Sequence, residues 1–228
     1  MNLAGFNKEK NQYKLVKDQS HWQEECYTET TDQDKDRKMS VTKIEQSIFG
    51  NLNRGRVAIF IDGANLFHAG LQLGLEIDYA KLLYCLTEKA KLLRAFFYTG
   101  VDRTNEKQQG FLLWMRRNGY RVVSKDLVQF PDGSKKANLD VEIAVDMINL
   151  APYYDTAVLV SGDGDLAYAV NALSYQGVRV EVVSIRSMTS DSLIDVTDYF
   201  VDIETIKQYI QKDSHSCYNY RPLSNSSF

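Results

Sequence analysis

The sequence of 228 residues has few of the residues that mark disulfide-bonded, zinc-thiolate or membrane proteins. It contains three cysteines and three histidines, and Cys26, Cys85 and Cys217 lie far apart without a C-x-x-C pair. This spacing argues against a disulfide framework and against a zinc site built from soft ligands. No apolar run reaches membrane-spanning length, and charged residues stand where a signal peptide would be apolar. We expect a soluble, cytoplasmic protein with no membrane contact.

An excess of basic charge is also missing. The 27 Lys and Arg residues are outnumbered by 30 Asp and Glu residues, which gives a formal net charge of −3. A global positive field therefore cannot attract a nucleic acid, and any such contact must use a local patch of basic side chains.

Composition divides the chain into three parts. Residues 1–53 are polar, with mixed charges and scattered hydrophobic residues, which predicts a disordered or weakly helical arm. Residues 54–210 carry the regular apolar patterns of one folded domain. Residues 211–228 are rich in Ser and Asn and are predicted to be a flexible tail.

Within residues 54–210, continuous apolar runs alternate with stretches of helical period. Runs of this kind are typical of strands buried on both faces, and their alternation with helices predicts βαβ units. We therefore expect an α/β domain with three Rossmann-like layers and a mostly parallel central sheet. The predicted strands are 56–61, 92–98, 120–123, 157–160, 178–183 and 199–203, and the predicted helices are 78–89, 106–118, 139–150, 166–175 and a short one near Ser192. Residues 130–133 predict the turn of a small ribbon before the third long helix, and Gly119 and Gly177 predict left-handed helix ends.

Four aspartates lie at the ends of these elements. Asp62 directly follows the first predicted strand, Asp163 and Asp165 follow the strand at 157–160, and Asp140 lies at the start of the helix at 139–150. In an open α/β sheet, the carboxyl ends of parallel strands meet at one edge, so these carboxylates should converge. Several negative charges at one place need compensation. A hard cation such as Mg²⁺ or Mn²⁺ provides it through oxygen ligands.

Each of these residues also has a purely structural reading. Asp62 and Asp165 are suited to capping a helix or making a turn, Asn65 could cap the first helix, and Asn138 could cap the third. Asp146 lies on the helix of Asp140 and fits a structural role as well as one that supports the metal ligands. The convergence of the acids, and no single residue, carries the prediction of a metal site.

The segments around these acids resemble three signature segments of NYN domains, which belong to the PIN-like nuclease superfamily. In order along the chain, they are Phe60–Leu66, Lys136–Asp140 and Ser161–Asp165. Over residues 55–210, the chain also resembles the cyanobacterial LabA-like branch of this family. The stretches that carry this second resemblance are Gly119–Val123, Ala137–Met147 and Met188–Leu193.

The resemblance implies a metal-dependent ribonuclease fold. It assigns Asp62, Asp140, Asp163 and Asp165 to the family's acidic positions and Asn65 to the asparagine of its first motif. On this basis we expect hydrolysis of an RNA phosphodiester with one or two Mg²⁺ or Mn²⁺ ions. LabA-like proteins are linked to control of gene expression, including circadian output. The alternative is therefore a non-catalytic regulatory protein that binds RNA or a protein partner.

Basic side chains near the predicted site are candidates for binding the backbone of RNA, which we expect to be single-stranded. Exposed Lys and Arg residues more often serve solubility, and Lys136 is the strongest candidate because it flanks Asp140. The candidates are Lys135, Lys136, Arg103, Arg116, Arg117 and Lys125.

Two other families share parts of the pattern. Residues 162–167 fit the G-x-G-x-x-A fingerprint of dinucleotide-binding domains, but Asp163 and Asp165 would place negative charge where the pyrophosphate binds. A haloacid-dehalogenase-type phosphatase would also have an aspartate after its first strand. Such an enzyme needs a second aspartate where this chain has Ala64.

Overall fold

The computed structural model describes residues 47–50, 53–129 and 135–213. Most of the predicted arm, the predicted turn at 130–133 and residues 214–228 of the predicted tail lie outside these ranges. The three-part division of the chain therefore stays a prediction. Among the described helices, none has the length and apolar character needed to cross a membrane.

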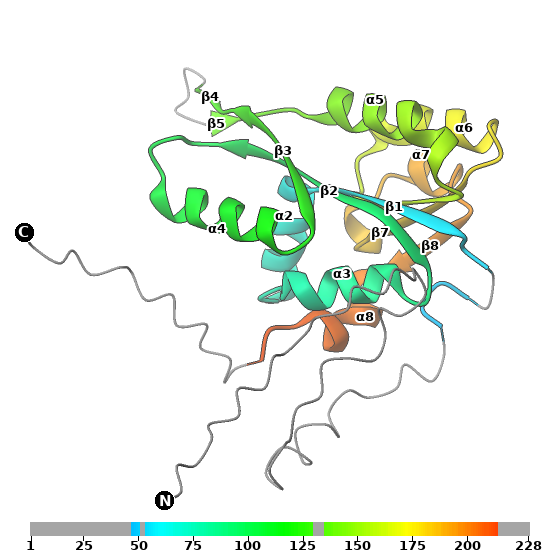
Figure 1. The fold of residues 1–228 in the computed structure, drawn as a ribbon, viewed down its shortest axis with the longest axis horizontal. Helices are drawn as coiled ribbons and strands as arrows, with labels where there is room; N and C mark the ends of the chain where they lie inside the picture. Colours follow the sequence, from blue (N-terminus) through cyan, green and yellow to red (C-terminus); the bar gives the residue numbers. More distant parts are fainter. Residues whose placement is uncertain (1–46, 51–52, 130–134, 214–228) are drawn as a thin grey trace, which may run out of the picture. The chain divides into compact units, whose positions relative to one another are not determined.

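Six strands form one fully parallel sheet in the order β3-β2-β1-β6-β7-β8 (Figure 1). This confirms the predicted α/β class with a parallel central sheet. The strands are β1 (Arg56–Asp62), β2 (Lys91–Val101), β3 (Tyr120–Asp126), β6 (Thr156–Val160), β7 (Arg179–Ser184) and β8 (Tyr199–Asp202). A separate antiparallel ribbon is formed by β4 (Val128–Gln129) and β5 (Lys135–Lys136). It lies where the sequence predicted a small ribbon.

Helices cover both faces of the sheet (Figure 1). One layer contains α2 (Gly63–Leu73), α3 (Tyr79–Thr87), α4 (Glu106–Arg117) and α8 (Ile203–Ile210). The other contains α5 (Asp140–Leu150), α6 (Ala167–Ser174) and α7 (Asp191–Ile194). Short 3₁₀ turns complete the chain: η2 (Ala151–Tyr153), η3 (Gly164–Leu166) and η4 (Arg186–Met188).

The alternation of side chains along β1 shows why three layers form. Val57, Ile59 and Ile61 point into the core beneath α2, α3, α4 and α8, while Ala58 and Phe60 point into the core beneath α5, α6 and α7. All five side chains are fully buried. A strand that is apolar on both faces is stable only between two helical layers, as its sequence predicted.

Some elements differ from the expectation. The edge strand β3 continues to Asp126, three residues past the predicted end. The prediction ended too early because the second half of the strand is exposed and polar and so lacks an apolar run. Helix α8 was not predicted, although Ile203, Ile206 and Ile210 bury one face of it. The two predicted left-handed ends are confirmed by positive φ angles of 91° at Gly119 and 77° at Gly177.

The strand order reverses direction between β1 and β6. From β1 the chain adds β2 and then β3 on one side, and it later returns to place β6, β7 and β8 on the other. Such a reversal leaves a crevice at the carboxyl ends of the two central strands, where ligands bind in open α/β sheets. Asp62 ends β1 and Asp163 follows β6, so both lie at this crevice.

Candidate metal centre

Asp62 caps helix α2. Its Oδ1 accepts hydrogen bonds from the backbone N–H groups of Ala64 (2.9 Å) and Asn65 (3.1 Å). Its Oδ2 accepts a longer bond of 3.4 Å from the Ser161 hydroxyl, which belongs to the loop after β6. The capping interpretation of Asp62 is therefore confirmed, and its Oδ2 has only the longer contact with Ser161.

Asn65 connects α2 to the loop after β6. Its side-chain oxygen accepts a hydrogen bond of 3.1 Å from the backbone N–H of Gly162. Because α2 begins at Gly63 with Asp62 as its cap, the interpretation of Asn65 as the cap was wrong. Asn65 instead fixes the position of the loop that carries Asp163.

The loop after β6 leaves no space for side chains at its glycines. A Cβ atom at Gly162 would lie 2.3 Å from the carbonyl oxygen of Met188, and one at Gly164 would lie 2.7 Å from the hydroxyl oxygen of Ser190. The loop therefore packs directly on the segment before α7. Asp163 caps η3 by accepting a bond of 3.0 Å from the N–H of Asp165, which orients the two side chains relative to each other.

Asp140 is the first residue of α5. Its Oδ2 accepts a hydrogen bond of 2.6 Å from the side-chain amide of Asn138, and its N–H donates one of 2.9 Å to the side-chain oxygen of Asn138. The residue at the cap position is Leu139, which makes no side-chain cap bond; Asn138 lies one residue earlier, but its side chain accepts the first N–H of α5 as a cap would. Asn138 orients the carboxylate of Asp140.

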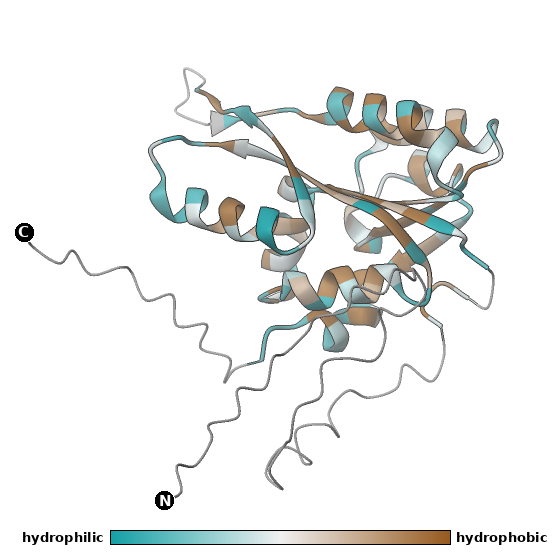
Figure 2. Cartoon of the chain, in the orientation of Figure 1, coloured by the Kyte–Doolittle hydropathy of each residue, from teal (hydrophilic) through white to brown (hydrophobic). Residues whose placement is uncertain are grey.

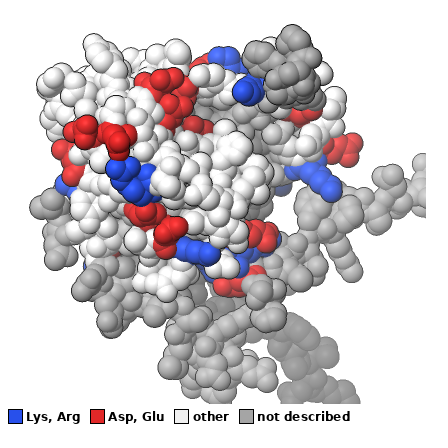
Figure 3. Space-filling view, turned by 180° about the vertical axis from the view of Figure 1, so that it is seen from behind, with Lys and Arg blue, Asp and Glu red and all other residues white. Residues whose placement is uncertain are grey.

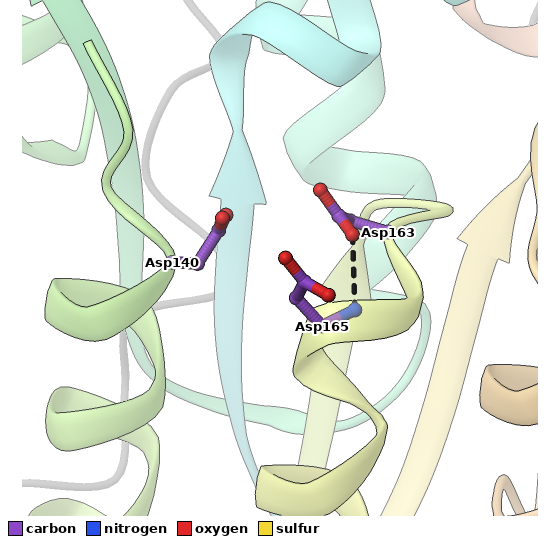
Figure 4. A group of neighbouring side chains, drawn as sticks. All are labelled: Asp140, Asp163 and Asp165. Carbon is purple, nitrogen blue, oxygen red and sulfur yellow. Dashed lines mark hydrogen bonds between the residues drawn. The ribbon is translucent and has the colours of Figure 1, made fainter.

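Three of the four predicted acids come together. One carboxylate oxygen from each of Asp140, Asp163 and Asp165 lies within 4.8 Å of the others. Figure 4 shows Asp140 approaching from the start of α5 on one side and Asp163 and Asp165 from the loop and η3 on the other. Asp62 is outside this trio, although its charge raises the pKa of Asp140 and the charge of Asp163 raises its own pKa. Within the described ranges, none of the four carboxylates forms an ion pair with Lys or Arg.

The electrostatics of the site are those of crowded, partly buried acids. Burial raises the pKa of Asp62 above its ordinary value, and the charge of Asp163 adds to this, while the N–H groups of Asn65 and Ala64 oppose it. Burial also raises the pKa of Asp140, with further contributions from the negative charges of Asp163, Asp62 and Asp165. Burial is the main cause of both shifts, and the neighbouring carboxylates add to it.

The donor set fits a hard divalent cation. Carboxylate oxygens from two different segments surround one point, and Mg²⁺ and Mn²⁺ bind such oxygens while retaining several waters. The partial exposure of Asp140, Asp163 and Asp165 leaves room for those waters and for a substrate oxygen. A closed structural site would lack this access.

Asp146 is not part of the trio. Its Oδ2 accepts a hydrogen bond of 2.9 Å from the hydroxyl of Tyr98, which is buried in β2 next to Asp62. This bond ties α5 to β2 and so holds the helix that begins at Asp140. Tyr98 ends the predicted strand 92–98, but no sequence signal identified it as the partner of Asp146.

The six basic candidates for binding RNA differ in whether their side chains form ion pairs. Arg103 forms an ion pair with Asp126 (2.9 Å), and Lys125 forms one with Glu142 (2.8 Å) and also donates to the carbonyl of Asn138. The exposed side chains of Arg116, Arg117 and Lys136 form no ion pair within the described residues, and the side chain of Lys135 is not described. Figure 3, which shows the reverse of the molecule, displays acidic and basic side chains intermixed without a broad basic area. This agrees with the small net charge.

Comparison with known families identifies the domain. The NYN domain family matches residues 56–204, which include all four aspartates and Asn65. The chain belongs to the NYN domain family. The NYN fold is of the nuclease type.

Two similar proteins support this assignment. The chain is 36% identical over 165 residues to the low amplitude and bright protein LabA of Synechococcus elongatus, covering 69% of this chain and 88% of that protein. This confirms the LabA-like character of the NYN domain. A crystal structure of VPA0982 from Vibrio parahaemolyticus, a protein of unknown function, superposes with a TM-score of 0.59 at 32% identity. The match covers 66% of this chain and 94% of that one.

Proposed function

We propose that this NYN domain hydrolyses phosphodiester bonds of RNA with the help of a divalent cation, Mg²⁺ or Mn²⁺. The observation that carries the proposal is the trio of Asp140, Asp163 and Asp165, whose oxygens lie within 4.8 Å of one another without a basic partner among the described residues. An uncompensated acidic group at the switch point of a parallel sheet is costly unless a cation binds there.

In this proposal, Asp140, Asp163 and Asp165 hold the cation, and Asp62 completes the acidic surface beside them. A bound divalent cation supplies two things: a lower pKa for a coordinated water and stabilisation of the negative charge that develops on phosphate. Asp62 is suited to accept a proton or a hydrogen bond at the crevice, because its Oδ2 has only the long contact to Ser161. Its raised pKa, caused mainly by burial, makes it a better proton acceptor than an ordinary aspartate.

Asn65 has a positioning role. The bond from Gly162 N–H to its side-chain oxygen holds the loop of Asp163 against the start of α2. This fixes the distance between the acids at the ends of β1 and β6. Movement of about 1 Å at such a site is enough to lower a rate about a hundredfold, so this bond is part of the catalytic geometry.

The substrate we propose is single-stranded RNA. Arg116, Arg117 and Lys136 are the candidates whose charges remain available within the described part of the chain, and each could contact phosphates without reading sequence. Arg103 and Lys125 would first have to leave Asp126 and Glu142. We further propose that cleavage serves control of gene expression in the cytoplasm.

The direct test is cleavage of single-stranded RNA by the purified full chain with and without Mg²⁺. We expect cleavage that needs the ion and that falls at least about a hundredfold in Asp163→Asn, because the substitution removes a charged ligand but keeps the size of the side chain. Glu204→Gln is the control, since it removes an exposed acid from the first turn of α8, on the other face of the sheet. Equal cleavage by wild type and Asp163→Asn would show that the activity belongs to a contaminant.

The alternative function is that of a non-catalytic regulatory protein that binds RNA or a protein partner, for example in circadian output. The 36% identity to LabA over most of that protein favours it. Binding of Mg²⁺ and of RNA by a wild-type chain that does not cleave any RNA offered would support this alternative.

A further inference from the structure

The outward faces of α5 and α6 expose large apolar side chains. On α5, Val141 is 70% exposed and Val145 is 49% exposed; Tyr168 of α6 is 84% exposed, and Tyr175, directly after α6, is 83% exposed. Ile148 and Tyr153, at the far end of α5 and in η2, extend the surface. The two helices pack against each other, and both carry apolar segments along their length in Figure 2. We call these six residues the α5–α6 face.

The helical pattern of α5 shows that this face is separate from the core. Ile143 and Met147 point inward and are buried. Val141 and Val145 lie two positions from Ile143, or about 200° around the helix, so they point to the opposite side. A helix on the surface of a monomer normally has polar residues there. An apolar outer stripe indicates that another surface covers it.

Charge on these helices excludes a nucleic acid as the covering partner. Helix α5 has the sequence DVEIAVDMINL and α6 has AYAVNALS, so neither contains Lys or Arg. The outer face of these helices therefore offers phosphates no cationic side chain. The acids Glu142 and Asp146 of α5 have partners in Lys125 and Tyr98, on the side of the helix that faces β2 and β3. The α5–α6 face itself is therefore nearly uncharged.

We propose that the α5–α6 face binds a second copy of this chain in a two-fold symmetric dimer. The apolar positions of α5 are spaced around Val145, with Val141 one turn before it and Ile148 about one turn after. If two α5 helices cross antiparallel at Val145, Val141 of each copy meets Ile148 of the other. A stripe that matches itself in this way is what a two-fold interface requires.

The exposed area is adequate for such an interface. Three tyrosines at these exposures offer about 450 Å², taking about 200 Å² for a complete aromatic side chain, and the three aliphatic residues add about 150 Å². The sum of about 600 Å² of apolar side chain approaches the roughly 800 Å² per partner of a standard interface. The surrounding polar atoms would supply the remainder.

The first test measures the mass of the full chain by sedimentation across a dilution series. We expect a dimer for wild type and at least about tenfold weaker association for Val145→Glu, because the two glutamates would face each other across the axis. Leu71→Glu is the matched control, since Leu71 is 64% exposed on α2, in the other helical layer. Unchanged thermal unfolding shows that each variant is folded. A monomeric wild type, or equal weakening by both variants, would overturn the proposal.

The second test uses the two-fold symmetry of the proposed dimer. A residue on a two-fold axis meets its own copy, so Val145→Cys should form an intermolecular disulfide under mild oxidation, while Leu71→Cys should not. Both are made with Cys26 and Cys217 changed to Ser, and Cys85 is retained because it is buried. Absence of a cross-link through Cys at 145 in a protein that sediments as a dimer would place the interface elsewhere. A face that captures only a different protein would also contradict self-association.

Discussion

Substitution of Asp165 by Asn should stabilise the protein when divalent ions are absent. Asp165 lies within 4.8 Å of carboxylate oxygens of Asp140 and Asp163. At that distance, two like charges repel by about 0.9 kcal/mol each at the dielectric constant of water. Two neighbours give about 1.7 kcal/mol, which salt reduces to about 1 kcal/mol. Asn keeps the shape of the side chain, and the described structure shows no side-chain hydrogen bond of Asp165 that would be lost.

The measurement is thermal unfolding in a chelator and again with Mg²⁺. For a domain of this size, about 1 kcal/mol corresponds to an increase of about 2–4 °C in Tm for Asp165→Asn in the chelator. Saturation with the ion should reverse the order, because binding to the native state at a hundred times its Kd adds about 2.7 kcal/mol to wild type. The variant has lost one ligand, so Mg²⁺ should add less stability to it than to wild type.

Glu204→Gln serves as the control for this experiment. It also removes an acid from the first turn of a helix, but it does so away from the acidic trio. We expect no increase in its Tm and a normal response to Mg²⁺. If Asp165→Asn lowers Tm in the chelator, the three carboxylates do not repel one another as their geometry implies. If Mg²⁺ shifts wild type and variant equally, the ion binds somewhere else.

Three further substitutions test the structure around the site. Gly162→Ala should lose about 1–3 kcal/mol of stability and most cleavage, measured by urea unfolding and RNA cleavage, because its Cβ would overlap the Met188 carbonyl. Tyr98→Phe should cost about 1–2 kcal/mol in the same unfolding assay, since Asp146 loses its donor; no loss would show that water replaces the bond. Glu181→Gln should lower the free energy of unfolding by about 3–5 kcal/mol, because Arg54 and Arg179, which contact the fully buried carboxylate, lose their counter-charge. A loss below about 1 kcal/mol would show that these arginines are solvated.

The central part of the fold could be predicted because its strands are buried on both faces. Runs such as Val57–Ile61 have no polar alternation and so predict a parallel sheet between helices. Edge elements gave a weaker signal. The second half of β3 is polar and exposed, and it is a strand only because it pairs with β2. That pairing depends on distant residues and leaves no local pattern.

The candidate site, like the fold, could be predicted from the sequence only in part. The positions of Asp140, Asp163 and Asp165 follow from their places at the ends of elements, but the double role of Asp62 does not. Whether an aspartate after a strand caps a helix or faces a ligand depends on which oxygen the N–H groups occupy, and here they occupy only Oδ1. The ion pair that engages Lys125 was also unpredictable, because it requires the position of α5 beside β3.

The convergence of the acids depends on one topological fact that composition and periodicity do not determine. Strand β6 pairs directly with β1, so Ser161 contacts Asp62 although 99 positions separate them. Had β6 been added outside β3, three strand spacings of about 4.8 Å would separate it from β1, or about 14 Å. Asp163 and Asp62 would then be screened from each other, and no common site would exist. The same local sequences are compatible with either order, so strand order, more than any motif residue, makes these aspartates one site.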